Sequence, residues 1–276
     1  MRAVRFLDEN QEARIGRLMG DVVVDAGPSG REGFVPSPEG WDRVARAAGP
    51  TYALADVRLL APVLPAKLVG IGLNYRDHAV ESELEIPDVP VVFAMWPSAL
   101  IGHDDTIVVP RDETRPDYEG ELAIVLGREV KDASPEEARA AIGGFSAFND
   151  VSGRRAQLET PLRQFTLGKS FDTFAPMGPC ISSLDEADLG GVAVKTSVSG
   201  ELLQDSNTSN LIFSPEELVA YCSTGLTLEA GTVIATGTPG GVGDSREPKR
   251  YLTADDVVEV FVEGVGTLRN RVEKEA

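Results

Sequence analysis

Short hydrophobic stretches separated by turn residues run through most of the chain. Apolar and polar side chains alternate over residues 3–6, 14–18 and 22–24, a pattern typical of half-buried β-strands. A serine, a proline and two glutamates follow one another at 134–137 and again at 214–217, which indicates a capped helix start with proline at the first helical position. A further helix is predicted over about 41–48. Other strands are predicted at 67–72, 106–110, 119–126, 144–149, 192–197, 232–235, 257–262 and 266–268.

Many short strands with few, short helices predict an α+β fold that is mainly β, rather than a repeating βαβ fold. A stretch rich in proline and glycine covers residues 27–40, and residues 61–65 have the composition of a linker. We therefore expect a small β-rich N-terminal domain at 1–62 and a larger domain at 63–276.

Composition and charge narrow the classes of function. The 276 residues include 26 Lys and Arg against 44 Asp and Glu, a net charge of −18. We therefore expect no nucleic-acid and no membrane partner, because both would need a positive surface to meet phosphate. Cys180 and Cys222 lie in apolar stretches and are expected to be buried thiols. With no signal-peptide pattern and no apolar run near about 18 residues, we expect a cytoplasmic protein.

Two glutamates stand at the start of the strand predicted over 119–126. Side chains alternate between the faces of a strand, so Glu119 and Glu121 share one face, and both faces are apolar after Glu121. Burial and a neighbouring negative charge each raise the pKa of a carboxylate, and a hard divalent cation removes both penalties. On this stretch alone, two solvated glutamates at a strand end explain the pattern equally well.

Asp150 favours the metal site over the solvated strand end. It ends the apolar segment 144–149, where an acidic side chain is unfavourable unless it binds something. Three carboxylates together with water molecules suit an octahedral Mg²⁺ or Mn²⁺ ion. Zinc fits less well, because no histidine or cysteine is close in sequence to either cluster.

Four other side chains are candidates for chemistry. His78 and Glu81 face the same way on one helical turn, and the spacing alone favours a surface pair. Lys169 lies in an apolar run, where a buried ammonium needs a partner. Arg154 offers a fork for a carboxylate, with a structural salt bridge as its alternative role. His103, in a predicted turn, is expected to be exposed and without a role.

Five motifs, taken in their order and spacing, resemble the fumarylacetoacetate hydrolase family over about residues 65–273. A sixth stretch, at 264–270, is also typical of that family. The five motifs are Asn74-Tyr75-Arg76-Asp77-His78-Ala79-Val80-Glu81, Asp117-Tyr118-Glu119-Gly120-Glu121-Leu122, Asn149-Asp150-Val151-Ser152-Gly153-Arg154, Thr166-Leu167-Gly168-Lys169-Ser170-Phe171-Asp172 and the glycine-rich segment 235–243.

The resemblance implies a β-roll catalytic domain, usually dimeric, behind a smaller N-terminal part. It implies that a catalytic Mg²⁺ or Mn²⁺ is held by three carboxylates and that a His-Glu dyad acts on a segment over the substrate. It also implies that several polar side chains contact substrate oxygens or the groups around the metal. The implied residues are Glu119, Glu121 and Asp150 for the metal, His78, Glu81 and Lys169 for catalysis, and Arg154, Gln157 and Thr238 for the substrate.

The sequence departs from the family pattern at two places. Met95 stands where many relatives have lysine, and Trp96 stands where they have a small residue or proline. Arg155 replaces a more usual acidic residue. If these side chains shape the cavity, the substrate is bulkier or less charged than the small dicarboxylates of the family.

The leading hypothesis is a metal-dependent hydrolase that cleaves a carbon–carbon bond in a β-diketo, acylpyruvate-like acid. His78, held by Glu81, would activate a water molecule, and Lys169 would stabilise the oxyanion. The main alternative is an isomerase, tautomerase or decarboxylase of 2-oxo acids, which uses the same site without an attacking water. A non-catalytic protein that keeps the fold is a third hypothesis, and the intact set of site residues argues against it.

Overall fold

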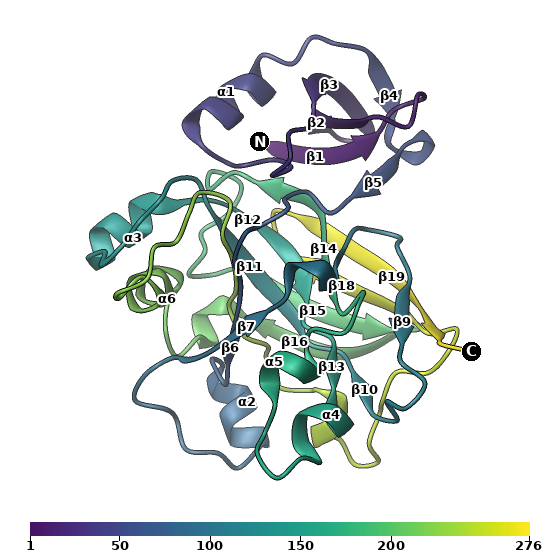
Figure 1. Ribbon diagram of the computed structural model, residues 1–276, viewed down its shortest axis with the longest axis vertical. Coiled ribbons are helices and arrows are strands. Elements are labelled where there is room, and N and C mark those ends of the chain that lie inside the picture. The colour runs from purple at the N-terminus through teal and green to yellow at the C-terminus, as the bar shows by residue number, and fades with distance from the viewer.

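The computed structural model describes residues 1–276 and confirms the predicted α+β, mainly β class (Figure 1). One long, mostly antiparallel sheet carries most of the strands. Its order is β4 (Thr51–Ala53), β3 (Val22–Pro28), β2 (Ala13–Met19), β1 (Arg2–Leu7), β14 (Ala175–Ser182), β12 (Ile142–Asn149), β11 (Gly120–Leu126), β17 (Val233–Ala235), β6 (Leu68–Gly72) and β7 (Val91–Met95), with β5 (Arg58–Leu60) beside β1 and β8 (Leu100–Ile101) beside β14.

A second sheet of five strands packs against the middle of the first. Leu122 and Phe145 of the long sheet share one buried cluster with Val260 and Leu268 of the second sheet. Burial of each such side chain contributes roughly 1.5–3 kcal/mol to folding. The order of the second sheet is β16 (Glu201–Asn207), β15 (Ala193–Val198), β18 (Val257–Val262), β19 (Gly266–Lys274) and β9 (Ile107–Val109), and a separate pair joins β10 (Pro116–Asp117) to β13 (Ser152–Gly153).

Helices cover the other face of the long sheet. The helices α3 (Pro135–Ala141) and α6 (Pro215–Cys222) lie side by side (Figure 1), and both begin with the predicted capping box, at Ser134 and Ser214. Their apolar faces pack on Ile124 and Ile234. The strand β11 is therefore buried on both faces, as its sequence predicts. The other helices are α1 (Pro38–Ala45), α2 (Arg76–Glu81), α4 (Arg154–Leu158) and α5 (Phe165–Gly168), with short 3₁₀ turns at Leu54–Asp56, Pro97–Ala99, Thr208–Asn210 and Gly243–Ser245.

The helix predicted at 41–48 begins earlier, with α1 at Pro38. The Ser37 side chain accepts a hydrogen bond from the Gly40 N–H, and proline occupies the first helical position. This local capping fixes the helix start before the apolar pattern begins. The strand predicted at 266–268 is longer than expected, because β19 pairs with β18 over residues 266–271 and then with β9 over residues 272–274.

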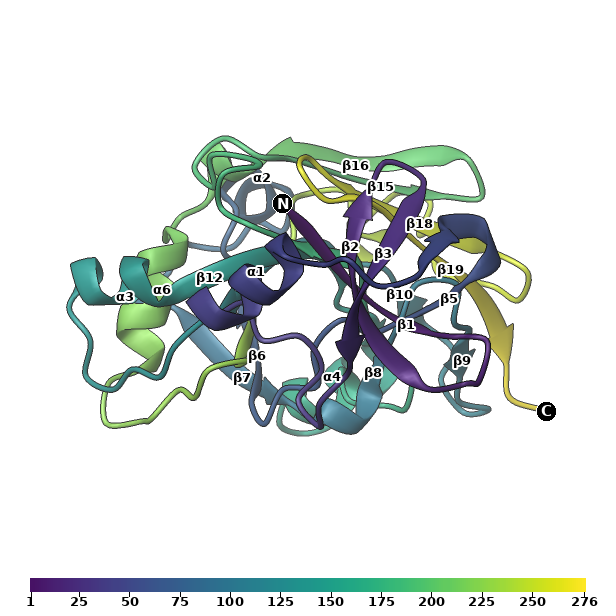
Figure 2. The same ribbon diagram turned by 90° about the horizontal axis from the view of Figure 1, so that it is seen from above.

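The N-terminal strands form their own unit above the rest of the molecule in Figure 1, and in the view from above they overlie it (Figure 2). They nevertheless join the long sheet, because β1 pairs with β14 through Arg2 opposite Ser182 and Ala3 opposite Ile181. The division into domains at 1–62 and 63–276 stays a prediction. Both cysteines are free and buried, as predicted.

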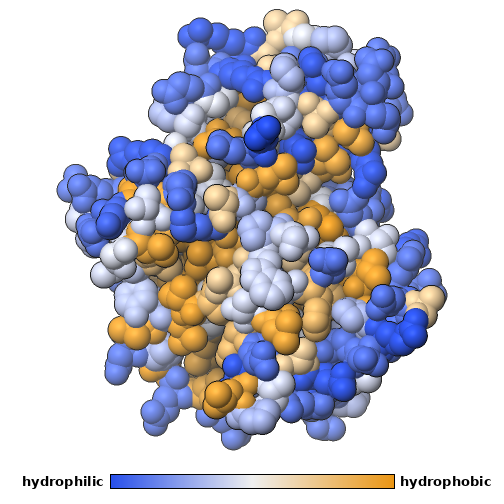
Figure 3. Space-filling model, in the orientation of Figure 1, coloured by the Kyte–Doolittle hydropathy of each residue, from blue (hydrophilic) through white to orange (hydrophobic).

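The surface is largely polar, with hydrophobic side chains gathered on the face that carries β7 (Figure 3). Val91 and Val92 on that edge strand are each about two-fifths exposed, at 41% and 44%. No helix combines the length and the hydropathy that crossing a bilayer requires.

Candidate active site

The three predicted metal ligands converge because β11 and β12 are hydrogen-bonded neighbours. Their register places Glu121 opposite Phe148, and the Asp150 N–H donates to the Glu119 carbonyl at 2.8 Å. Carboxylate oxygens of Glu119, Glu121 and Asp150 lie within 4.8 Å of one another. None of the three residues is more than 6% exposed. The structure thus brings together three acids that are distant in sequence.

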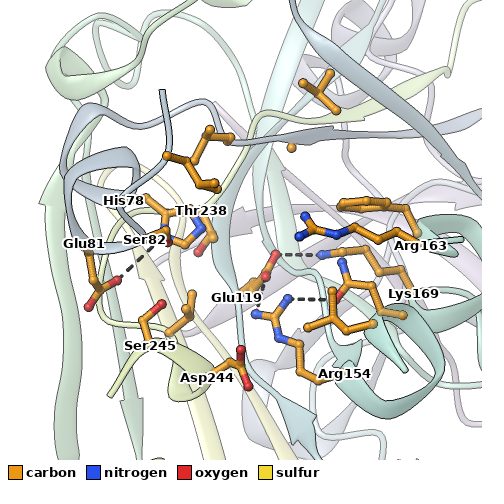
Figure 4. Close-up of a pocket in the computed structure, with 18 of the residues that line it drawn as sticks. His78, Glu81, Ser82, Glu119, Arg154, Arg163, Lys169, Thr238, Asp244 and Ser245 are labelled. Atoms are coloured by element: carbon orange, nitrogen blue, oxygen red, sulfur yellow. Dashed lines mark hydrogen bonds and ion pairs between the residues drawn. The ribbon is translucent and has the colours of Figure 1, made fainter. Parts of the chain in front are cut away.

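Two buried cations stand against this acidic cluster (Figure 4). Lys169 Nζ donates to Glu119 Oε2 and to Asp150 Oδ2, at 2.7 Å in each case. Arg154 donates from Nη2 to Glu119 Oε1 at 2.6 Å and from Nε to Asp117 Oδ2 at 2.9 Å. Pairing of β10 with β13 places Arg154 next to Asp117. Lys169 also lies 5.3 Å from the centre of the Phe93 ring.

The cluster holds four carboxylates against two cations, so its ionised form carries an excess of two negative charges. Two carboxylate oxygens, Glu121 Oε1 and Asp150 Oδ1, are buried without a hydrogen-bond partner. A buried acceptor without a partner is unfavourable, and carboxylate oxygen is the ligand that Mg²⁺ and Mn²⁺ prefer. The residues present therefore fit a hard divalent cation.

The pKa values of the three predicted metal ligands reflect this excess of negative charge. Burial raises the pKa of Glu121 well above its usual range, and the charges of Asp150 and Glu119 raise it further. Burial also raises the pKa of Asp150, to about 6, although Lys169 opposes this. Burial would raise the pKa of Glu119 too, but Lys169 and Arg154 outweigh it and hold that pKa at about 2. The raised pKa values of Glu121 and Asp150 reflect the excess negative charge that a bound cation would neutralise.

His78 and Glu81 lie together on α2, as their spacing predicts. His78 Nδ1 is 3.6 Å from Glu81 Oε2, which also accepts the Gly241 N–H at 2.8 Å. Burial would raise the pKa of Glu81, but the nearby His78 imidazole and the hydrogen bond from the Gly241 N–H outweigh it and lower this pKa. The carboxylate therefore stays ionised and can orient and stabilise a protonated imidazole.

The glycine-rich loop after β17 connects the two halves of the site. The Gly237 N–H donates to Glu121 Oε2 at 2.8 Å, and Gly237 has a φ of 100° with Asn74 so close that a Cβ would lie 2.7 Å from it. Only glycine is accommodated there without strain. The hydroxyl of Thr238 donates to the Gly120 carbonyl at 3.1 Å and accepts from Gln204 at 2.7 Å.

A cavity of about 600 Å³ lies between α2 and the acidic cluster (Figure 4). His78 and Glu81 occupy one side, and Glu119, Arg154 and Lys169 the other, with Glu121 and Asp150 buried beside Glu119. All the predicted site residues except those two line the cavity, including Gln157 and Thr238. Gln157 accepts from Arg154 Nη1 at 3.0 Å through its side-chain oxygen. Such a chamber admits a small organic acid.

Two expectations from the sequence are wrong. Met95 points into the core, where it is 2% exposed, and Trp96 follows the end of β7 with 52% of its surface exposed, so neither lines the cavity. Arg155 also lies outside the cavity. His103 is not simply exposed, since 22% of its side chain is accessible and its Nδ1 accepts the Arg269 N–H at 3.1 Å. The departures from the family pattern at Met95, Trp96 and Arg155 therefore do not indicate a bulkier substrate.

Several residues of the site have no role assigned from the sequence. Asp117, inside a recognised motif but without an assigned role, is fully buried and binds Arg154. Arg163 and Asp244 also line the cavity. The position of Asp117 inside the motif that contains Glu119 is the signal that could have marked it, whereas Arg163 lies in a loop whose pattern carries no periodicity.

Comparison with known proteins shows the family to which the chain belongs. Residues 67–273 match the model of the fumarylacetoacetate (FAA) hydrolase C-terminal domain. Over 229 residues, 80% of this chain and 75% of the relative, the chain is 42% identical to the oxaloacetate tautomerase YisK of Bacillus subtilis. Two solved structures match over the whole of both chains with TM-scores of 0.83. They are a 5-carboxymethyl-2-hydroxymuconate delta-isomerase from Mycobacterium smegmatis, at 35% identity, and a fumarylacetoacetate hydrolase from Exiguobacterium antarcticum, at 37%. The chain belongs to the fumarylacetoacetate hydrolase family.

Proposed function

We propose that this protein is a divalent-metal-dependent tautomerase of a small 2-oxo acid, with oxaloacetate as the first substrate to test. The observation that carries the proposal is the pair of buried carboxylate oxygens without partners, Glu121 Oε1 and Asp150 Oδ1, beside a cavity that His78 lines from the other side. Relatives named as an oxaloacetate tautomerase and a muconate isomerase support proton transfer over hydrolysis. This proposal takes the alternative in place of the leading hydrolase hypothesis.

Keto–enol conversion needs one proton removed from carbon and one added to oxygen. In the proposed reaction His78 accepts the proton from the carbon next to the keto group, and Glu81 stabilises the imidazolium that forms. The electrons of the broken C–H bond form the C=C bond, and the π electrons of the C=O bond move to the keto oxygen. That oxygen takes a proton from water to give the enol, and the His78 imidazolium releases its proton to water. The return of a proton from His78 to carbon reverses the reaction.

Lys169 stabilises the negative charge that develops on the keto oxygen. Its ammonium uses two N–H groups on Glu119 and Asp150, which leaves the third as a donor at the cavity wall. Glu119, Glu121 and Asp150 would hold Mg²⁺ or Mn²⁺. Such an ion, when bound, supplies Lewis acidity at the oxygen atoms of the 2-oxo acid. The choice between the two metals and the formation of a homodimer stay predictions.

The experiment that tests this function follows the loss of the enol form of oxaloacetate by ultraviolet absorbance with Mg²⁺ present. Uncatalysed conversion is subtracted with a blank that contains Mg²⁺ and buffer alone. We expect the wild type to accelerate conversion and His78→Gln to lose that acceleration, while His103→Gln, which alters the other histidine, keeps it. Wild-type rates equal to the blank would contradict the tautomerase.

Mass spectrometry of the products separates the competing reactions. Tautomerisation leaves the mass of the acid unchanged in ordinary water and incorporates deuterium at carbon in D₂O. Decarboxylation lowers the mass by one CO₂. Hydrolysis of an acylpyruvate in ¹⁸O-labelled water places the label in a carboxylate product, and this outcome would restore the hydrolase hypothesis.

A further inference from the structure

The cavity contains three cationic side chains, and they are not equivalent. Arg154, Arg163 and Lys169 all line it. Each of the three side-chain nitrogens of Arg154 already has a protein acceptor, and Lys169 bridges two carboxylates. Arg163 makes no ion pair and no hydrogen bond. It therefore brings a positive charge into the cavity that no protein carboxylate neutralises.

The position of Arg163 suits an incoming anion. It lies in the loop between α4 and α5, and its guanidinium points into the cavity beside Lys169, across from His78 (Figure 4). The base of this loop is fixed, because the Gln164 N–H donates to the Gln157 carbonyl at 3.0 Å and the Phe165 ring packs 5.6 Å from that of Phe93. An exposed arginine on an anchored loop can close on a ligand without rebuilding its surroundings.

Charges on the remaining walls restrict where a second carboxylate of the substrate can lie. Glu81 and Glu83 line the side of α2, and Asp244 lines the wall near Arg154. A carboxylate next to any of these would be repelled. The one remaining N–H of Lys169 is assigned to the keto oxygen, so Arg163 is the cationic group in the cavity whose donors are all free for a second carboxylate. Its planar fork matches a carboxylate in a bidentate manner.

We propose that Arg163 is a specificity-determining residue that binds the second carboxylate of a 2-oxo diacid, so that the enzyme prefers dianionic over monoanionic 2-oxo acids. The inference rests on the proposed function, which it deepens by naming the substrate class. It replaces Arg154, the carboxylate fork expected from the sequence, with a residue whose donors are free.

Kinetics with a matched pair of substrates tests the proposal. Oxaloacetate and its 4-ethyl ester share the 2-oxo acid end, and only the former carries the second carboxylate. We expect Arg163→Gln to raise KM for oxaloacetate by about 10- to 100-fold, the worth of a hydrogen-bonded charge pair, with kcat nearly unchanged. Values for the ester should not change. Arg163→Lys should restore part of the affinity, because it keeps the charge and loses the fork.

Arg155→Gln is the matched control, since Arg155 is a nearby exposed arginine whose side chain lies outside the cavity. We expect it to match the wild type with both substrates. Equal effects of Arg163→Gln on diacid and ester, or no effect on either, would overturn the role of Arg163 and leave the proposed function intact.

Calorimetry decides the inference even if the wild type enolises neither substrate, a result that would count against the proposed function alone. Oxalylglycine and oxamate are unreactive analogues that share the 2-oxo acid end, and only oxalylglycine carries a second carboxylate. With Mg²⁺ present, Arg163→Gln should weaken oxalylglycine binding by about 10- to 100-fold and leave oxamate binding unchanged. Equal binding of oxalylglycine by the wild type and by Arg163→Gln would overturn the proposal.

Discussion

The two sides of the cavity are built differently. On one side, Glu119, Asp150 and Lys169 are almost completely buried and joined by hydrogen bonds of 2.7 Å. On the other side, the side chains of His78 and Glu81 are 15% and 28% exposed, and 3.6 Å separates their closest nitrogen and oxygen. The first arrangement fixes charge in one geometry, whereas the second leaves a titratable base accessible. A site that holds an ion and moves a proton needs both.

Because the two sides differ in burial, substitutions can distinguish effects on stability from effects on activity. Groups in the buried cluster depend on one another, because the loss of one charge leaves its partners buried and unpaired. Groups on α2 retain contact with water and can change charge with little effect on the fold. Substitutions on the two sides should therefore differ in the property that they damage.

The largest effect is expected for Lys169→Met, which removes the ammonium between Glu119 and Asp150. Breaking a buried ion pair costs about 3–5 kcal/mol, so the free energy of unfolding in urea should fall by that amount, and turnover should be lost as well. Lys195→Met, which breaks an exposed pair with Asp205, is the control and should change stability by less than about 1 kcal/mol. Equal stabilities would show that the buried network is dispensable.

His78→Gln should lower activity while leaving stability almost unchanged. The rate of enol conversion is expected to fall by about 10²- to 10⁴-fold, the usual contribution of a general base. The free energy of unfolding should change by less than about 0.5 kcal/mol, because the imidazole is partly exposed. Its polar contacts are long, at 3.5 Å to the Ser82 hydroxyl and 3.6 Å to Glu81. A stability loss as large as that of Lys169→Met would remove the distinction between the two sides.

In the metal-free protein, Asp150 and Glu81 should contribute to the pH dependence of stability with opposite signs. The folded-state pKa of Asp150 is raised to about 6, so its contribution is present below the unfolded value of about 3.9 and lost as the pH rises through about 6. The folded-state pKa of Glu81 is lowered, so its contribution is present above about 4.3 and lost as the pH falls below it. Urea titrations of Asp150→Asn and Glu81→Gln against the wild type, from pH 3 to about 8, measure both slopes. Slopes of the same sign would contradict this assignment.

The smallest effect is expected for Asp77→Asn, which weakens the attachment of α2 without touching the imidazole. Asp77 Oδ1 accepts the Gly240 N–H at 3.3 Å, and Oδ2 accepts the Ser206 hydroxyl at 2.5 Å. We expect a loss of about 1 kcal/mol in stability and a several-fold lower kcat with KM unchanged, since Asp77 positions His78. Asp88→Asn, at an exposed site outside the cavity, is the control. A changed KM with an unchanged kcat would argue against a positioning role.

The sequence predicted those parts of the site that depend on strand alternation and helical spacing. Alternation predicts that Glu119 and Glu121 share a face, and their carboxylate oxygens do converge, although Glu119 stands one residue before β11. His78 meets Glu81 because three residues span a helical turn. The start of α1 was misplaced, because capping by Ser37 precedes the apolar pattern.

Residues fixed by tertiary contacts could not be predicted in this way. Met95 points into the core because of its place on β7, and Arg163 enters the cavity from a loop without periodicity. The bonds from Arg154 to Asp117 and Glu119 depend on the pairing of β10 with β13, which the sequence alone does not specify. The sequence therefore predicts a substrate contact for Arg154 and does not predict its bonds to Asp117 and Glu119.

The central claim is that the buried acids form a site for one hard divalent cation. A crystal grown with Mn²⁺ and oxalate, examined by anomalous scattering at the manganese edge, tests it most directly. We predict a single manganese peak bound by Glu119, Glu121 and Asp150, with oxalate on its cavity side and Lys169 still paired. An anomalous map with no peak among these three carboxylates, with the Lys169 ammonium as the sole counter-charge there, would contradict the claim.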